Sequence, residues 1–264
     1  KKKLKKILFF TGSRADYGKL KPLINITKAD KKFKVNIMAT GMHTQKHYGY
    51  TYREIIKDFN EVKLIKFVNQ KKSDPMDIIL IKTIKILGKA LKIVRPDLVV
   101  IHGDRIETLA ASVYCNLNNI LIAHVEGGEV SGTVDESLRH STTKLSHSHF
   151  VSNKKAKDLL KKMGEGKKNI FVIGSPEVDI MLSKKLPSIK DVMKRYNIKF
   201  KNYAILLYHP VTTLKKKEII KECNIFFSVL KKSSKKFILI YPNNDTHSEI
   251  IFKHIEKLKK NKNF

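Results

Sequence analysis

The chain of 264 residues has little cysteine, few acidic residues and no long hydrophobic run. Its two cysteines, Cys115 and Cys223, lie in apolar segments with helical spacing, so we expect buried thiols in a reducing compartment rather than a disulfide framework. A membrane-spanning helix needs about 18 consecutive apolar residues, and no run approaches that length. The apolar stretch behind the basic start stops at Gly12, too early for the core of a secretory signal. The sequence therefore predicts no membrane span.

Several motifs of nucleotide and covalent chemistry are also missing. The sequence contains neither G-x-x-x-x-G-K-[ST] nor G-x-G-x-x-G, which argues against a P-loop and against nicotinamide chemistry. It has no G-x-S-x-G turn, and neither cysteine lies in a turn that would present a nucleophile. His147 and His149 have the spacing of a chelate, but there is no H-E-x-x-H and no Cys/His quartet. We therefore expect no metal site and no cofactor.

The charge balance is extreme, with 54 lysines and arginines against 24 acidic residues and a formal net charge of +30. A protein that binds nucleic acid or a membrane surface is one explanation. Only six of the basic residues are arginine, however, and the lysines are spread along the whole chain, whereas readers of bases and phosphates favour the bidentate guanidinium. We expect a solvated lysine-rich surface and no specific nucleic acid. A basic nucleic-acid-binding protein is the alternative from another functional class.

Short apolar runs alternate with segments of helical spacing over most of the chain. We predict strands at residues 7–11, 33–39, 62–68, 97–101, 119–123, 149–152 and 169–173, and helices at 19–30, 74–94, 106–117, 135–145 and 153–163. Strands separated by helices of this length are typical of a parallel α/β sheet.

A break near residues 175–187 precedes a second α/β alternation. There we predict strands at 203–208 and 237–241 and helices at 216–230 and 248–260. Two strands are too few for a parallel sheet that is covered on both faces. We therefore predict a first domain over residues 1–175 and an incomplete second domain over residues 176–264.

Acidic and basic side chains follow two neighbouring strands of the first domain. His102-Gly103-Asp104-Arg105 comes after one strand, and Glu126-Gly127-Gly128 after the next. Parallel α/β sheets bind ligands at the carboxyl ends of their strands, and adjacent strand ends lie about 5–10 Å apart. That separation lets two carboxylates flank one sugar carbon, so Asp104 and Glu126 are candidate acid and base. The two glycines would leave room for a substrate against the backbone.

Further candidates lie on both sides of this pair. Glu136 and His140 are four residues apart in a predicted helix and share a face. The loop at residues 12–18 lies at the first β-to-α turn, where phosphates bind, and contains a permanent cation in Arg14.

In the second domain, His209 and Asn243 each adjoin a proline at the end of a predicted strand. The proline disfavours helix there and keeps the polar strand end extended. We expect these two strand ends to complete a cleft between the domains.

Together these segments resemble the hydrolysing UDP-N-acetylglucosamine 2-epimerases. The matching stretches occur in the family's order and are Gly12-Ser13-Arg14-Ala15-Asp16-Tyr17, His102-Gly103-Asp104-Arg105, Glu126-Gly127-Gly128-Glu129-Val130-Ser131-Gly132-Thr133, Ser137-Leu138-Arg139-His140, His209-Pro210-Val211-Thr212-Thr213 and Pro242-Asn243. The long third block distinguishes this family from the non-hydrolysing epimerases. The resemblance implies two Rossmann-like domains of the glycosyltransferase-B type. It also implies a cytoplasmic homo-oligomer, dimer or tetramer, that supplies sialic acid or a related nonulosonic acid.

The resemblance also implies a reaction. UDP-N-acetylglucosamine, or a UDP-2,4-diacetamido-trideoxyhexose, would lose UDP by elimination and gain water, which leaves a free N-acetylmannosamine-type sugar. In this chain the implied roles are acid/base catalysis by Asp104, Glu126 and Glu136, assistance to the leaving phosphate or water by His209, and substrate binding by Arg14, Ala15, Asp16, Arg105 and Asn243.

The sequence departs from the family at two places. Asp135-Glu136 stands where some relatives have two aspartates. The family also continues beyond the length of this chain, with a serine-rich nucleotide-binding turn and a glutamate that grips the ribose. We therefore expect a C-terminally truncated chain that turns over poorly by itself.

Other functions fit parts of the same evidence. A non-hydrolysing epimerase or a glycosyltransferase of the same fold is the nearest alternative, and a degenerate fragment or sensor without catalysis is a more distant one. The sequence leaves open which sugar nucleotide is bound and whether it carries UDP or GDP.

Overall fold

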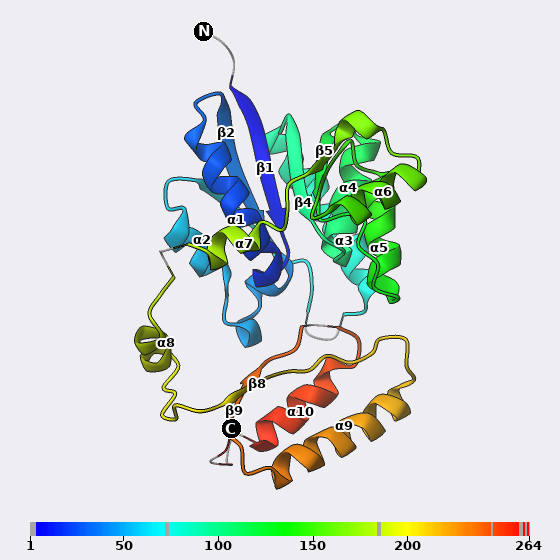
Figure 1. Cartoon of the computed structure of the whole chain (residues 1–264). Helices are drawn as coiled ribbons and strands as arrows, with labels where there is room; N and C mark the ends of the chain where they lie inside the picture. The colour runs from blue at the N-terminus through cyan, green and yellow to red at the C-terminus, as the bar shows by residue number, and fades with distance from the viewer. Residues whose placement is uncertain are drawn as a thin grey trace. The chain divides into compact units, whose positions relative to one another are not determined.

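The computed structural model describes residues 4–71, 74–183, 186–243, 245–258, 261 and 263. The chain forms two compact units, Lys1–Lys185 and Leu186–Phe264. The first unit contains a seven-stranded parallel sheet in the order β3-β2-β1-β4-β5-β6-β7. Figure 1 labels its strands β2, β1, β4 and β5. Its strands are β1 (Lys5–Thr11), β2 (Phe33–Ala39), β3 (Lys63–Lys66), β4 (Leu98–His102), β5 (Leu121–Val125), β6 (Ser148–Val151) and β7 (Ile170–Val172). The predicted parallel α/β fold is confirmed.

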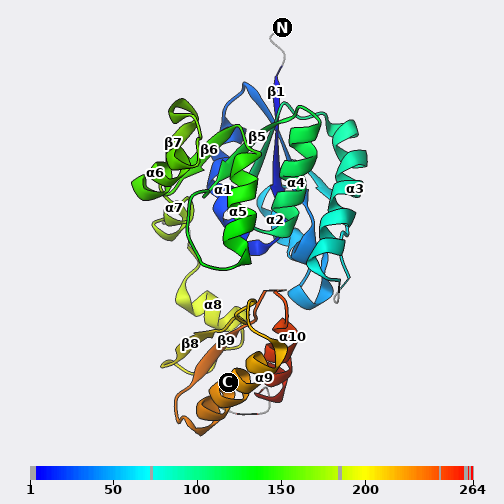
Figure 2. The same ribbon diagram turned by 90° about the vertical axis from the view of Figure 1, so that its right-hand side faces the viewer.

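Helices cover both faces of this sheet because successive residues of its buried strands point to opposite sides. The α-helices are α1 (Arg14–Ala29), α2 (Tyr52–Asp58), α3 (Met76–Val94), α4 (Ile106–Leu117), α5 (Val134–Lys144), α6 (Lys154–Lys162) and α7 (Glu177–Met181). Leu20 and Ile24 of α1 pack with Phe9 on one face. Leu87 of α3 and Cys115 of α4 pack on the other, where α3, α4 and α5 lie side by side (Figure 2).

The strand order reverses direction between β1 and β4. From β1 the chain builds outward through β2 to β3, then returns to the other side of β1 and continues from β4 to β7. A crevice at the carboxyl ends of strands is the usual ligand site at such a switch point. The segments that follow β1 and β4 are those in which the sequence predicted phosphate binding and catalysis.

The first helix begins earlier than predicted. The expected loop at residues 12–18 contains only a short turn, because α1 starts at Arg14 rather than near residue 19. Ser13 is its N-cap, and its hydroxyl accepts a hydrogen bond from the backbone N–H of Asp16. Two 3-10 turns (Gly41–Thr44 and Lys46–Tyr48) and α2 were not predicted either, since they are too short for a clear apolar repeat.

The second unit contains a two-stranded parallel sheet of β8 (Ala204–Leu207) and β9 (Phe237–Ile240). Its helices are α8 (Ile189–Arg195), α9 (Lys216–Lys232) and α10 (Ser248–Leu258). Both strands and the two longer helices were predicted, whereas α8 was not, and residues 259–260 of the predicted last helix lie outside the described residues. Phe227 of α9 and Ile251 of α10 form its small core around Cys223. Both cysteines are free and buried, as the sequence predicted.

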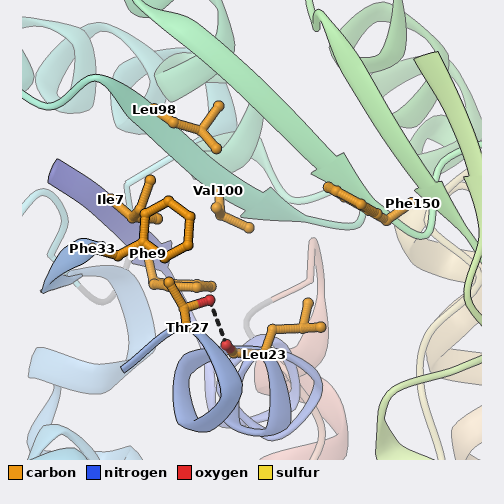
Figure 3. A pocket seen from close by; sticks show the side chains of 8 residues that line it. All are labelled: Ile7, Phe9, Leu23, Thr27, Phe33, Leu98, Val100 and Phe150. Carbon is orange, nitrogen blue, oxygen red and sulfur yellow. Dashed lines mark hydrogen bonds between the residues drawn. The ribbon is translucent and has the colours of Figure 1, made fainter. Parts of the chain in front are cut away.

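An apolar pocket opens on the face of the sheet that carries α1 (Figure 3). It is lined by Ile7, Phe9, Leu23, Thr27, Phe33, Leu98, Val100 and Phe150. The hydroxyl of Thr27 donates to the Leu23 carbonyl at 2.7 Å, so its polar group is already satisfied. This pocket offers no acid or base, and the catalytic candidates lie elsewhere. Among the described residues, no helix combines the length and apolarity that crossing a membrane requires.

The two glycines after β5 do not leave the open space that the sequence analysis expected. A Cβ on Gly127 would lie 2.8 Å from the Thr143 hydroxyl, and a Cβ on Gly128 would lie 2.5 Å from Leu160 and 2.7 Å from the Ala156 carbonyl. These positions therefore let the loop pack closely against α5 and α6.

Replacing Gly128 with alanine should destabilise the first unit through this close packing. Gly128 and Gly49 have nearly the same left-handed backbone, with φ of 83° and 82°, but nothing lies within 4 Å of a Cβ on Gly49. In both Gly128→Ala and Gly49→Ala, the new Cβ in a left-handed backbone should lower the free energy of unfolding by roughly 1–2 kcal/mol. Gly128→Ala should lose a further ~1–3 kcal/mol from overpacking. Urea unfolding of both variants measures the difference, and equal losses would contradict the packing argument.

Candidate active site

Asp16 is held in place by the first turn of α1. Its carboxylate accepts a hydrogen bond from the backbone N–H of Gly12 at 3.2 Å, and only 4% of the residue is exposed. Arg14 and Ala15, the other predicted substrate-binding residues of this turn, are exposed. The helix N-terminus thus fixes one carboxylate inside the protein and leaves the two preceding residues in solvent.

His102, at the end of β4, lies between Asp16 and Glu126. Its Nδ1 is 3.4 Å from Oδ1 of Asp16, and its Nε2 is 3.0 Å from Oε2 of Glu126. The side chains of His102 and Glu126 are 11% and 12% exposed. The histidine therefore joins the carboxyl ends of β1, β4 and β5.

Glu126, the residue after β5, collects several donors. Lys19 of α1 donates to both of its carboxylate oxygens at 3.0 and 2.9 Å, and the Ser175 hydroxyl donates to one of them. The backbone of Glu126 has φ of 59°, a left-handed conformation that is uncommon for a residue other than glycine and that often marks functional sites. Lys19 also pairs with Glu177 at the start of α7.

The contacts set the charges of this cluster. Burial raises the pKa of Glu126, but the hydrogen bonds from His102, Lys19 and Ser175 outweigh it and lower the pKa to about 2. Burial lowers the pKa of His102, and its bonds to Asp16 and Glu126 outweigh that effect and raise it to about 9. The pKa of Asp16 is lowered in the same way, since His102 counteracts the effect of burial. At neutral pH both carboxylates are ionised and the imidazole is a cation.

Asp104 has a partner of a different kind. Its carboxylate is paired with the guanidinium of Arg139 in α5, and Arg139 also donates to the Glu129 carbonyl at 2.7 Å. The Asp104 side chain is 28% exposed, more than that of Glu126. Arg105, which the sequence assigned to the nucleotide, has its Nε 3.2 Å from the fully buried carboxylate of Glu107.

Glu136 is bound by its own loop. It lies in the first turn of α5 and accepts two hydrogen bonds of 2.7 Å from the backbone N–H groups of Ser131 and Gly132. These bonds lower the pKa of its carboxyl. His140 lies one turn further along the helix, with Nε2 3.7 Å from Glu136, so the expected shared face is confirmed.

His209 and Asn243 belong to the second unit. His209 follows β8, and its Nδ1 lies 3.3 Å from Asp245, which follows β9. Asn243 is part of the same segment after β9 and is half-buried. The structure thus brings the two predicted strand ends of this unit together, while Asn244 lies outside the described residues.

Residues 25–264 match the family model described as UDP-N-acetylglucosamine 2-epimerase. A UDP-N-acetylglucosamine 2-epimerase of Neisseria meningitidis is 42% identical over 259 residues, which cover 98% of this chain and 68% of the relative. The chain belongs to the UDP-N-acetylglucosamine 2-epimerase family.

Another relative in this family is the UDP-N,N'-diacetylbacillosamine 2-epimerase (hydrolyzing) of Legionella pneumophila. It is 34% identical over 263 residues, which cover 96% of this chain and 68% of the relative. The crystal structure of the Neisseria meningitidis UDP-GlcNAc 2-epimerase bound to UDP-GlcNAc superposes with a TM-score of 0.75 at 21% identity, covering 97% of this chain and 70% of that one. These epimerases and the present chain share the glycosyltransferase-B type of fold.

Neither Lys19 nor Ser175 was predicted as part of this candidate site, and the sequence did not show that His102 bridges two carboxylates. A helix that starts at Arg14 places Asp16 and Lys19 three residues apart on one face. The Ser13 N-cap is the sequence signal that places this pair in the first turns of α1. Lys19 is 107 residues from Glu126 in the sequence, and Ser175 is 49 residues from it. No periodic pattern of residues links positions so far apart.

The low pKa of Glu126 predicts a loss of stability in acid. A carboxyl whose pKa is lower in the folded than in the unfolded state stabilises the fold above the unfolded value, and this contribution is lost as the pH falls toward the folded value. For Glu126 that window runs from 4.5 down to about 2. Urea unfolding between pH 6 and pH 3 should therefore show a steeper decline for the wild type than for Glu126→Gln.

Glu61→Gln is the matched control for this measurement. Glu61 also pairs with a lysine, Lys28, but its side chain is 51% exposed, so water screens the pair. Its acid dependence should stay close to that of the wild type. A Glu126→Gln profile parallel to the wild type would contradict the assignment of an ionised, buried carboxylate.

Proposed function

We propose that the chain is a hydrolysing UDP-N-acetylglucosamine 2-epimerase. The observation that carries this proposal is the position of the Glu126 carboxylate, which contacts Lys19 at 2.9 Å and His102 at 3.0 Å beside the switch point of a sheet of this family. The Legionella relative acts by hydrolysis, as its name states, and the block from Glu126 to His140 resembles that branch of the family. The name of the Neisseria relative does not mention hydrolysis, so the non-hydrolysing reaction is the competing proposal.

The proposed reaction begins with departure of the nucleoside diphosphate. Positive charge then builds at C1 of the sugar and makes the C2 proton removable, so that a base can take it and leave a 2-acetamidoglycal. Water adds across the double bond and gives the free sugar with inverted C2. The proposed substrate is UDP-N-acetylglucosamine, and the diacetamido sugar nucleotide of the Legionella relative is the second choice.

The proposed roles follow the surroundings of each residue. Glu126 is anionic and shielded from solvent, which suits the stabilisation of positive charge at C1. Its proposed role as a base follows the family resemblance, because a pKa of about 2 makes the carboxylate a weak base while Lys19, His102 and Ser175 hold it. Asp104 and Glu136 are the other proposed acid/base groups. His209 is proposed to assist the leaving phosphate or water, and Arg14, Ala15, Asp16, Arg105 and Asn243 are proposed to bind the substrate. Asp16 is buried against His102, so its proposed contribution to substrate binding is indirect, through that histidine.

Proton NMR of the chain with UDP-N-acetylglucosamine in D₂O tests this function. The expected products are UDP and free N-acetylmannosamine that carries deuterium at C2. Glu126→Gln and Asp104→Asn should each lower the rate by roughly 10²–10⁴-fold, because acid/base groups contribute that much. Glu61→Gln, an exposed ion-pair variant in the same unit, should keep the wild-type rate.

Other products would decide against the proposal. UDP-N-acetylmannosamine with its glycosidic bond intact would establish the non-hydrolysing reaction. If the chain hydrolyses only UDP-N,N'-diacetylbacillosamine, the proposed hydrolysing reaction stands and the proposed substrate, UDP-N-acetylglucosamine, is wrong. Release of UDP without deuterium at C2 would rule out epimerisation.

A further inference from the structure

Each nitrogen of the His102 ring faces a carboxylate oxygen. Nδ1 faces the carboxylate of Asp16 at 3.4 Å, and Nε2 faces the carboxylate of Glu126 at 3.0 Å. Ionised carboxylates only accept hydrogen bonds, and neutral imidazole carries a single N–H. A neutral ring would therefore turn a lone pair toward one of the two anions, so the geometry selects the imidazolium.

The neighbouring strand holds a histidine that shows the opposite arrangement. His124 in β5 is fully buried, and its Nε2 lies 2.8 Å from the Gly103 carbonyl while Nδ1 lies 3.1 Å from the Thr143 hydroxyl. One N–H and one acceptor satisfy these partners, and burial lowers its pKa to about 3. Two adjacent strands thus hold one charged and one neutral histidine because their partners differ.

We propose that His102 is a positioning residue, an imidazolium that ties the proposed base Glu126 to Asp16 at the start of α1. This inference rests on the proposed function for the role of Glu126, whereas the charged bridge itself rests on the two contacts of the ring and on the ionised state of both carboxylates. Without a cation between them, the two buried carboxylates would repel each other. The left-handed backbone of Glu126 makes its side-chain direction depend further on such external contacts.

Other charged groups also surround this bridge. Lys19 lies on the far side of Glu126, so Glu126 keeps one cation when His102 is removed. The titratable and charged groups that act on the Asp16–His102–Glu126 bridge are Lys19 of α1, His43 after β2, Arg105 after β4, His124 of β5 and Glu177 of α7. Removal of His102 should therefore misorient Glu126 and raise its pKa only part of the way toward its ordinary value.

The first test is an NMR titration of ¹⁵N-histidine-labelled chain without substrate. The ring of His102, assigned by its absence in His102→Gln, should be doubly protonated from pH 6 to pH 8 and should titrate near pH 9. Removal of one anion in Glu126→Gln should move this titration to lower pH. A singly protonated ring at pH 7.5 would overturn the proposal, and so would a titration that Glu126→Gln leaves unchanged.

The second test compares the kinetics of His102→Gln and His149→Gln. His149 in β6 is more deeply buried than His102, with 1% of its side chain exposed against 11%. It contacts one carboxylate, that of Glu165, at 3.1 Å, so it controls for the loss of a buried histidine. His102→Gln should lower kcat by about 10²-fold, leave KM within about threefold, and move the acidic limb of the pH–rate profile upward, whereas His149→Gln should do none of these.

The outcomes separate the two proposals. Wild-type kcat and an unchanged pH profile in His102→Gln would overturn the positioning role. If neither the wild-type chain nor a C-terminally extended chain converts a sugar nucleotide, the proposed function is overturned, and the NMR titration still decides whether the charged bridge exists.

Discussion

A buried carboxylate stays ionised only where cations and N–H or O–H donors replace the water that it has lost, and Glu126 shows how this chain meets that requirement. Its partners come from distant parts of the sequence: Lys19 in α1, His102 in β4 and Ser175 before α7. Each of these contacts requires the sheet to be assembled, because only the parallel order brings the ends of β1, β4 and β5 together. The charge balance of the site is therefore a property of the tertiary fold.

The sheet supplies this arrangement through simple local chemistry. Apolar runs such as Leu98–His102 fix the strands between two layers of helices, and the polar residues that end each run emerge at one edge. The Ser13 cap turns the chain into α1 immediately after β1, which places Asp16 and Lys19 over that edge. Beyond β7, Glu177 pairs with Lys19, so the segment before the second unit is tied to the same charged cluster.

The strength of the apolar pattern decided what could be predicted from the sequence. The parallel strands and long helices of the first unit could be predicted because apolar runs alternate with polar turns. Asp104 and Glu126 follow two of these strands, so their position at the carboxyl edge of the sheet could be predicted as well. The start of α1 was misplaced because the Gly12 and Gly18 positions suggested a long loop, although Ser13 and Asp16 form a helix start. The bridging role of His102 was beyond the sequence, since it depends on the distances between side chains of three separate elements.

The negative charges of the three proposed acid/base carboxylates are balanced by different partners. The partners and the solvent exposure of each carboxylate bear on the step of the proposed reaction that it suits. Glu126 faces an imidazolium and an ammonium and is shielded from solvent, so any proton it takes must come from a bound molecule or from His102. Asp104 faces one guanidinium and is more exposed, so water can reach its carboxylate. Glu136 accepts hydrogen bonds from two backbone N–H groups at the start of α5. Backbone N–H groups do not give up their protons at neutral pH. In the proposed reaction, the solvent access of Asp104 suits the addition of water, because that step needs a water molecule beside the acid/base group.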